Sequence, residues 1–278
     1  MAKRPTIILV SDCDHMTLNR ARSVFSALNA HGVPFTNAIF NKLETYDEHP
    51  YSGRSLAKHC RPLETCSVVD ETASAYIEIL KEQNKLGNEI AYHGNSQISN
   101  DREAFLSGIR NINSLCDLTM TTYIEHGGNP GSHPIEGCKK ETLAMEGKNM
   151  DSEFYVYDLI LENFKQAWCY FDLIDLKKED NVSLNKRDIF YNKDGMKLMR
   201  RARAGDVVNL LRFMKNEDDV CILYTHFGYD GYPTGTLLES WNTPRSVEKN
   251  CLFLKRLQKE GFKLQTIQGY LSEQDDKN

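Results

Sequence analysis

The fold is set near the N-terminus by the stretch TIILVSDCDH, residues 6–15. Residues 6–10 are β-branched or aliphatic, and such a run is typical of a buried strand. Asp12, Asp14 and His15 then follow together at the end of that strand. A core strand that ends in two carboxylates and an imidazole predicts a functional site at this point.

Apolar strands alternate with amphipathic helices from this strand to the end of the chain. Alternation of this kind predicts a parallel α/β sheet. Seven or eight such units favour a closed (β/α)7–8 barrel over an open sheet, and we expect residues 1–278 to form one domain. The expected strands after the first cover residues 35–40, 89–92, 120–124, 167–171, 207–211, 220–224 and 264–267, and the expected helices lie around residues 18–28, 73–80, 106–115 and 247–257.

Two segments interrupt this alternation, near residues 41–71 and 127–151. The first is polar and contains prolines, and the second is rich in Gly, Pro and Lys. Loops of this length inside a domain often carry function. We therefore expect both segments to form walls or lids of a site.

The composition is that of an ordinary globular protein, with 40% hydrophobic and 26% charged residues. A net charge of −5 gives no reason to expect binding to nucleic acid or to an anionic membrane. No apolar stretch approaches the roughly 20 residues that a membrane span needs, and the apolar run after the basic N-terminus is too short for a signal-peptide core. We therefore expect a cytoplasmic protein whose eight scattered cysteines are buried free thiols.

Four predicted strands end in carboxylate or imidazole side chains. In parallel α/β folds, active sites gather at the carboxyl ends of the strands, where groups far apart in sequence converge. Carboxylate and imidazole are ligands for Zn²⁺ and similar ions, and such a site can activate water for hydrolysis. A further carboxylate can take the proton of the water, and a further histidine can protonate the leaving group. The clusters are Asp12 to His15, His93 to Gln97, Glu125 to Asn129, and Thr225 with His226.

Each of these residues also has a purely structural explanation. A lone histidine at a strand end is more often hydrogen-bonded within the fold than bound to a metal, and Asp14 before a helix can be the N-cap of that helix. Gly127-Gly128 is first of all a turn. Taken together, the four clusters favour one functional site over four separate structural roles.

In their order along the chain, these motifs resemble those of the NodB-homology polysaccharide deacetylases, carbohydrate esterase family four. Residues 12–14, 89–97 and 222–226 match three motifs of that family, and residues 253–267 match its closing helix and strand. The resemblance implies a distorted, NodB-like (β/α) barrel. It also implies an enzyme that removes acetyl groups from N-acetylated sugars with a divalent metal, usually zinc.

The resemblance implies roles for single residues as well. Asp12 would be the general base, Asp14 and His93 would be metal ligands, and His226 would be the general acid. Cys13 lies between the two aspartates. Because side chains alternate along a strand, we expect Cys13 to face away from them and to pack in the core.

Two departures from the family pattern affect the metal site. Gln97 stands where the family has a second histidine ligand, and an amide oxygen is a poor substitute for imidazole on zinc. Residues 123–128 replace the family's Arg-x-Pro-Tyr motif, whose arginine orients the base. We expect His126 to supply the missing imidazole, with Gln97 as the alternative third ligand and His15 as a weaker candidate. The opposing hypothesis is a metal site that is weak or lost.

The predicted activity is metal-dependent hydrolysis of the N-acetyl group of a sugar, with a cytoplasmic intermediate of surface-polysaccharide synthesis as the substrate. Glu125, Tyr229 and Trp241 are candidates for sugar contacts, because aromatic rings can stack on a sugar, although ordinary loop packing explains the two rings equally well. Three alternatives stay open. They are hydrolysis of a non-sugar amide on the same barrel, a non-catalytic carbohydrate-binding protein and, more remotely, a glycosidase that uses two carboxylates.

Overall fold

The computed structural model describes residues 5–14, 16–43, 66–96, 100–126, 150–151, 155–168, 190–208, 211, 220–228 and 237–276. Most of the two long loops predicted near residues 41–71 and 127–151 lies outside these ranges, as do His15, Gln97 and Tyr229. The organisation of residues 1–278 as a single domain stays a prediction.

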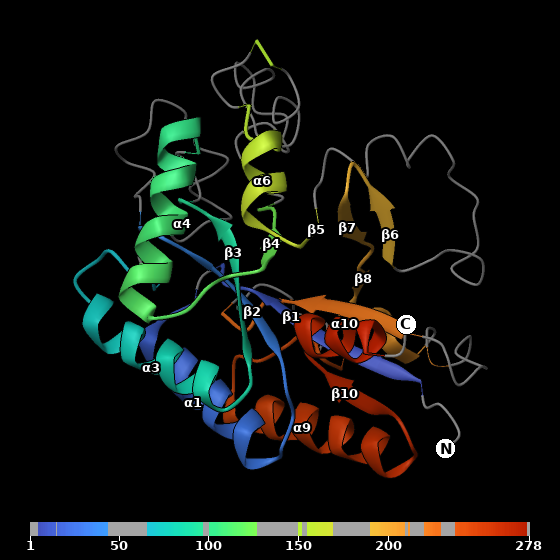
Figure 1. Ribbon diagram of the computed structural model, residues 1–278. Coiled ribbons are helices and arrows are strands. Elements are labelled where there is room, and N and C mark those ends of the chain that lie inside the picture. Colours follow the sequence, from blue (N-terminus) through green and yellow to red (C-terminus); the bar gives the residue numbers. More distant parts are fainter. Residues whose placement is uncertain are drawn as a thin grey trace, which may run out of the picture.

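A ten-stranded sheet forms the centre of the molecule (Figure 1). Its strands are β1 (Thr6–Asp12), β2 (Thr36–Phe40), β3 (Glu89–Gly94), β4 (Thr122–Ile124), β5 (Gln166–Trp168), β6 (Phe190–Lys193), β7 (Met196–Met199), β8 (Ala202–Arg203), β9 (Val220–Thr225) and β10 (Lys263–Gln265). Their order is β6-β7-β5-β4-β3-β2-β1-β9-β8, and β10 pairs with β1. Every pairing is parallel except that of β6 with β7.

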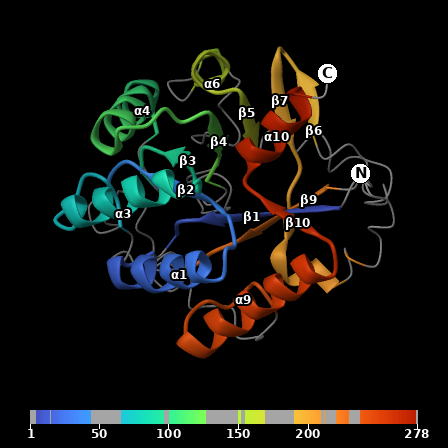
Figure 2. The same ribbon diagram turned by 60° about the horizontal axis from the view of Figure 1, so that its bottom comes forward.

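The sheet curls as a half-barrel, which confirms the predicted α/β class and its distorted barrel form. Among the described strands, no pairing joins β8 to β6, so hydrogen bonds do not close the ring there. The helices are α1 (Leu18–Ala30), α3 (Ala73–Lys85), α4 (Arg102–Cys116), α6 (Tyr157–Asn163), α9 (Pro244–Lys259) and α10 (Ile267–Asp275), with a short 3-10 turn, η4 (Ala204–Asp206). Figure 2 shows α1 and α9 on one side of β1 and α10 on the other.

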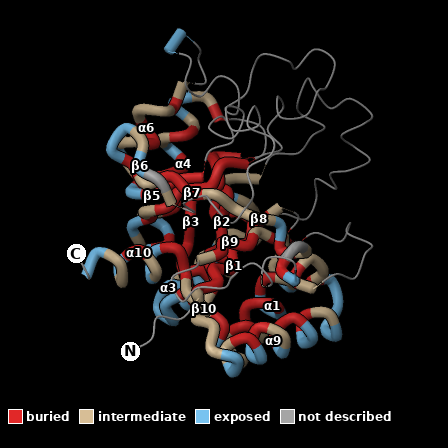
Figure 3. Tube along the Cα trace, turned by 90° about the vertical axis from the view of Figure 1, so that its right-hand side faces the viewer, coloured by how far each residue is buried: buried red, intermediate tan, exposed pale blue. Residues whose placement is uncertain are grey.

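Alternate residues of the strands build two cores on opposite faces of the sheet. On β1, Ile7 and Leu9 belong to the larger core, which also contains the buried sides of α1, α3, α4 and α9. Ile8 and Val10 belong to the smaller core, which α10 covers with Ile267 and Leu271. The strand backbones are accordingly buried along most of their length (Figure 3).

The same alternation places the aspartates. Cys13 belongs to the larger core and is fully buried, as expected from its position between the two aspartates. Asp12 continues the alternation of Ile8 and Val10 and therefore points to the opposite face. Asp14 is not the N-cap of α1, because Thr17 caps that helix by accepting a hydrogen bond from the backbone N–H of Arg20.

Three further sequence predictions can be compared with the structure. The five cysteines among the described residues are buried and free, as predicted. The strand predicted over residues 207–211 is wrong at its start, since Val207 and Val208 continue helically from η4, with Val207 buried and Val208 exposed. Among the described residues, no helix is long and apolar enough to cross a membrane.

Candidate metal centre

Three predicted metal ligands meet at the carboxyl ends of neighbouring strands. Asp14 follows β1, His93 lies on β3, and His126 follows β4. One ligand atom from each lies within 4.8 Å of the others. The Nε2 atoms of His93 and His126 are 3.9 and 3.4 Å from the Oδ1 atom of Asp14. A carboxylate and two imidazoles gathered in this way form a group that can hold a divalent metal.

The ring of His93 is held in an orientation that suits a ligand. Its Nδ1 atom lies 2.6 Å from the carbonyl oxygen of Ile124, to which Nδ1–H can donate. The ring also packs against Phe40, at 4.8 Å between centroids. With Nδ1 protonated, the lone pair is on Nε2, which is buried and has no hydrogen-bond partner. An orphaned, buried imidazole nitrogen beside a carboxylate fits a metal ion.

Burial and neighbouring charges give these groups the protonation states that a metal needs. Burial lowers the pKa of His93 to about 4, so the ring is neutral near neutral pH. Burial alone would raise the pKa of the Asp14 carboxyl, but His126 and His226 beside it hold that pKa well below its usual range. Neutral imidazole and ionised carboxylate are the forms that bind metals.

His226, the predicted general acid, lies at the same centre. It follows β9, and its Nε2 atom is 3.4 Å from the Oδ2 atom of Asp14. The two oxygens of Asp14 therefore face different histidines, Oδ1 toward His126 and Oδ2 toward His226. The side chain of His226 is 17% exposed, whereas that of His93 is fully buried. Of the two, His226 is the one that an incoming substrate can reach.

Asp12, the predicted general base, forms a two-pronged ion pair with Arg201. The guanidinium nitrogens Nη1 and Nη2 donate to Oδ1 and Oδ2 at 2.7 and 3.2 Å. Burial alone would raise the pKa of Asp12, but Arg201, with His93 and His226, outweighs it and lowers the pKa below the usual value. Asp12 is thus ionised and fixed in orientation, as a proton acceptor must be.

Arg201 is a site residue that the sequence prediction missed. It follows β7, and its guanidinium lies between the rings of Trp168 and Tyr224, at 3.9 and 4.9 Å from their centroids. The available signal was the strand-like segment of residues 196–199, Met-Lys-Leu-Met, which two arginines follow. Arg201 thus reaches Asp12 from the end of β7 and not from β4, whose end the sequence analysis compared with the family's Arg-x-Pro-Tyr motif.

The predicted sugar contacts are only partly described. Trp241 is fully buried in the larger core, where its indole N–H donates to the carbonyl oxygen of Leu238 at 2.9 Å. Its ring packs on Phe227, so the packing explanation holds and the sugar-stacking role does not agree with this position. Glu125 is also fully buried, and its contact with a sugar stays a prediction. Tyr229 and Gln97 lie outside the described residues.

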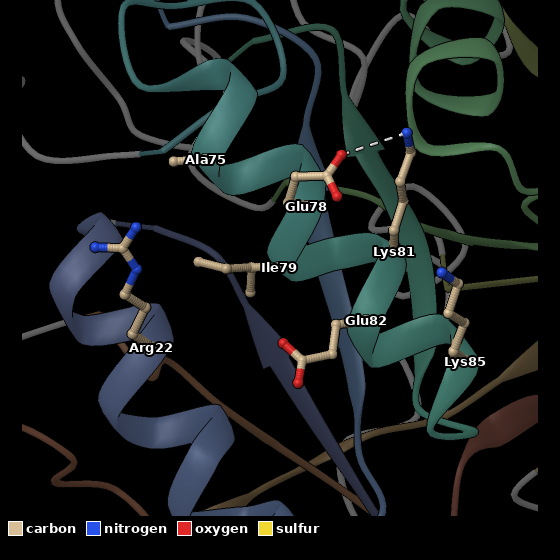
Figure 4. Close-up of a pocket in the computed structure, with 7 residues that line it drawn as sticks. All are labelled: Arg22, Ala75, Glu78, Ile79, Lys81, Glu82 and Lys85. Atoms are coloured by element: carbon tan, nitrogen blue, oxygen red, sulfur yellow. Dashed lines mark ion pairs between the residues drawn. The ribbon is translucent and has the colours of Figure 1, made fainter.

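A surface hollow of about 410 Å³ lies away from the strand ends, between α1 and α3 (Figure 4). Arg22 of α1 and charged residues of α3 line it, including the ion pair of Glu78 with Lys81 at 3.6 Å. None of the residues that line it belongs to the strand-end clusters. This hollow therefore takes no part in the metal centre.

No protein-family model matches the sequence, and no curated protein matches it. Solved structures do match along the chain. Peptidoglycan deacetylase PdaC from Bacillus subtilis is 11% identical, with 99% of this chain and 93% of that chain covered and a TM-score of 0.46. The Xyl-CE4 domain of a multidomain xylanase from the hindgut metagenome of Trinervitermes trinervoides is 10% identical, with 98% and 92% covered and a TM-score of 0.46.

A third match is BA3943 from Bacillus anthracis, a CE4 family pseudoenzyme. It is 9% identical to this chain, with 96% of this chain and 66% of that chain covered and a TM-score of 0.42. Family four of the carbohydrate esterases, named in two of these descriptions, is the family that the sequence resembles. Identities near 10% and TM-scores below 0.5 are too low to assign a function. Function must therefore be argued from the side chains of the site.

Proposed function

We propose that this chain is a metal-dependent hydrolase that removes the acetyl group from an N-acetylated sugar. Asp14, His93 and His126 would hold the metal, and we expect zinc because two imidazoles and a carboxylate form a common zinc ligand set. The observation that carries the proposal is the buried Nε2 atom of His93, which has no hydrogen-bond partner and lies 3.9 Å from the Asp14 carboxylate.

A divalent metal bound there would supply Lewis acidity to the acetamide carbonyl and to the attacking water. Asp12 would accept the proton of that water, since Arg201 holds its carboxylate ionised and in a fixed orientation. His226 would donate a proton to the departing amine from the exposed side of the centre. A cytoplasmic intermediate of surface-polysaccharide synthesis remains the substrate we expect, and the five buried free thiols suit a reducing compartment.

A second candidate is a hydrolase of a non-sugar amide with the same residues. The burial of Trp241 favours it, because this removes one of the two aromatic rings expected to stack on a sugar. The non-catalytic binding protein is less well supported. A protein that binds sugar without chemistry has no use for an ionised, arginine-clamped Asp12 beside two histidines, His93 and His226.

Metal content and substrate range test the proposal. We expect purified protein to carry about one metal ion per chain, lost in His126→Ala and kept in Gln97→Ala. N-acetylated sugars and small linear or cyclic amides should then be offered to the metal-loaded wild type. Release of acetate from the sugars supports deacetylation, and turnover of the amides alone supports the second candidate. A wild type that takes up no metal after incubation with zinc would favour the binding protein.

A further inference from the structure

A β-bulge lies at His93, one of the proposed ligands of the metal centre. The parallel pairing of β2 with β3 joins Ile39 to Tyr92 and then Phe40 to Gly94, so the register skips His93. An extra residue of this kind bends its strand and changes the direction of a side chain, and such bulges gather near active sites. Ala91 belongs to the smaller core and Tyr92 to the larger one, so His93 keeps the face of Ala91, and the bulge leaves it outside the register with β2.

The bulge needs glycine at position 94. Gly94 has φ = +137°, a region that side chains with a Cβ rarely adopt. A Cβ at this position would lie 2.7 Å from the Oδ1 atom of Asn100, closer than real contacts allow. The backbone after His93 therefore takes its path because residue 94 has no side chain and because Asn100 fills the space beside it.

Asn100 holds the segment that follows the bulge. Its Oδ1 atom accepts a hydrogen bond from the backbone N–H of Asn95 at 2.7 Å, and its Nδ2 atom donates to the carbonyl oxygen of Ser96 at 2.8 Å. Asn41, directly after β2, adds a third bond from its Nδ2 atom to the Oδ1 atom of Asn95 at 2.9 Å. Both asparagines are buried, at 2% and 4% exposure.

We infer that Asn100, with Asn41 in support, is a positioning residue for the metal centre, which acts by fixing the bulge that presents His93. This inference rests on the proposed metal site. Asn100 bonds the backbone of Asn95 and Ser96, and Asn41 bonds the side chain of Asn95, so both act on the segment that follows His93. Side chains outside the ligand set that orient a ligand commonly change metal affinity by about 10- to 100-fold.

Asn88 provides a matched control at the other end of β3. It is 5% exposed, and its Oδ1 atom accepts a hydrogen bond from the backbone N–H of Phe35 at 3.2 Å. Its Nδ2 atom donates to the Oε1 atom of Gln83 at 3.0 Å. Asn88 thus resembles Asn100 in burial and bonding, but it precedes the first residue of β3 whereas Asn100 supports the last.

The test compares Asn100→Ala, Asn41→Ala and Asn88→Ala with the wild type. Calorimetric titration of the metal-free proteins with Zn²⁺ gives the dissociation constants, the visible absorption of the Co²⁺-loaded proteins reports ligand geometry, and thermal unfolding without metal reports stability. All three variants should lose stability. We expect about a 10- to 100-fold weaker affinity and an altered Co²⁺ spectrum in Asn100→Ala, a smaller loss in Asn41→Ala, and no change of either in Asn88→Ala.

Two results overturn the inference in distinguishable ways. A wild type that binds neither ion would remove the proposed function and this inference with it. A wild type that binds, with Asn100→Ala or Asn41→Ala binding equally well and giving the same Co²⁺ spectrum, would remove the inference alone. Asn41→Ala also serves as the deciding variant if Asn100→Ala does not fold, because it removes only one of the three bonds.

Discussion

The carboxyl and amino ends of the parallel strands both carry largely buried carboxylates, but in opposite electrostatic settings. At the carboxyl ends, Asp12 and Asp14 face arginine and histidine, and their pKa values are lowered. At the amino ends, Glu89 opens β3 with 6% exposure, and its pKa is raised. The same chemical group on one sheet is thus kept ionised at one end and shifted toward its protonated form at the other.

The partners of Glu89 explain this difference. Burial raises its pKa, and only neutral donors oppose that effect. The hydroxyl of Thr36 donates to Oε2 at 2.8 Å, the hydroxyl of Thr122 donates to Oε1, and the backbone N–H of Gln268 donates to Oε2 at 3.0 Å. Ile267 also donates its backbone N–H to the Thr36 hydroxyl at 3.2 Å. Glu89 therefore ties α10 to the base of the sheet.

Burial alone therefore does not mark a functional carboxylate. The partners of Glu89 come from strands and a helix that it holds together, and its oxygens are satisfied by them. The carboxyl end instead brings charged and titratable groups together and leaves the Nε2 atom of His93 without a partner. In a structural anchor all polar atoms have hydrogen-bond partners, whereas in a candidate metal centre a polar atom without a partner is available to bind the metal.

The largest expected effect comes from removing the charge at the carboxyl end. Asp12→Asn should lower kcat by about 10²- to 10⁴-fold, the usual contribution of a general base, while metal content stays the same. Glu89→Gln is the matched change at the amino end and should retain the wild-type kcat. Steady-state kinetics of both variants check this, and equal losses of activity would erase the distinction between the two ends.

A second expected effect is on stability and on the pH dependence of the rate. Arg201→Met should destabilise the fold by about 3–5 kcal/mol, because it leaves Asp12 buried without its cation. Losing Arg201 also removes the main influence that lowers the pKa of Asp12. The acid limb of the pH–rate profile should therefore move to higher pH. Urea unfolding and kcat/KM against pH measure the two effects, and an unmoved acid limb would contradict the base role of Asp12.

The contribution of Glu89 to folding stability should depend on pH with the sign opposite to that of Asp12 and Asp14, whose pKa values are lowered. Its folded-state pKa is raised, so its contribution to stability is present below the unfolded pKa of about 4.3 and is lost as pH rises through the folded pKa. The free energy of unfolding of Glu89→Gln, relative to wild type, should therefore increase from acidic to neutral pH. Denaturant unfolding across that range measures it, and a difference that is constant with pH would refute the raised pKa.

The smallest expected effect comes from removing one of the hydrogen-bond donors to Glu89 at the amino ends of the strands. Thr36→Val removes the hydroxyl that donates to Glu89 and accepts from Ile267. We expect a loss of about 1 kcal/mol in the free energy of unfolding, the usual contribution of a hydrogen bond, with kcat unchanged. A loss of activity in Thr36→Val would mean that the anchor influences the metal centre at the far end of the strands.

Much of the site could be predicted because strand alternation has a fixed period. An apolar strand followed by Asp12 and Asp14 already determines that both aspartates share a face and that Cys13 does not. The same rule, applied to a parallel sheet, predicts that His93, His126 and His226 end near Asp14. The structure brings these side chains together as the sequence suggested, while their roles in metal binding and catalysis stay proposals.

The rest depended on contacts that the sequence does not show. Arg201 belongs to a run of three arginines within four residues, a pattern typical of a solvated surface. It lies between β7, which pairs with β5, and β8, which pairs with β9 beside β1, and this placement brings it to Trp168 and Asp12. Trp241 was expected at the site because it follows His226 in the chain, but it folds back onto Phe227 in the core. The bulge at His93 is a single-residue shift of register, which residue types do not reveal.

The bulge also affects how such a chain can evolve. Because the pairing of β2 passes from Tyr92 to Gly94, the residue at position 93 contributes nothing to the register between these two strands. Under the proposed function, a mutation that replaces this histidine would therefore remove a metal ligand and leave the pairing of the sheet intact. Under the proposed function, metal binding at position 93 and the pairing of β2 with β3 would change independently of each other.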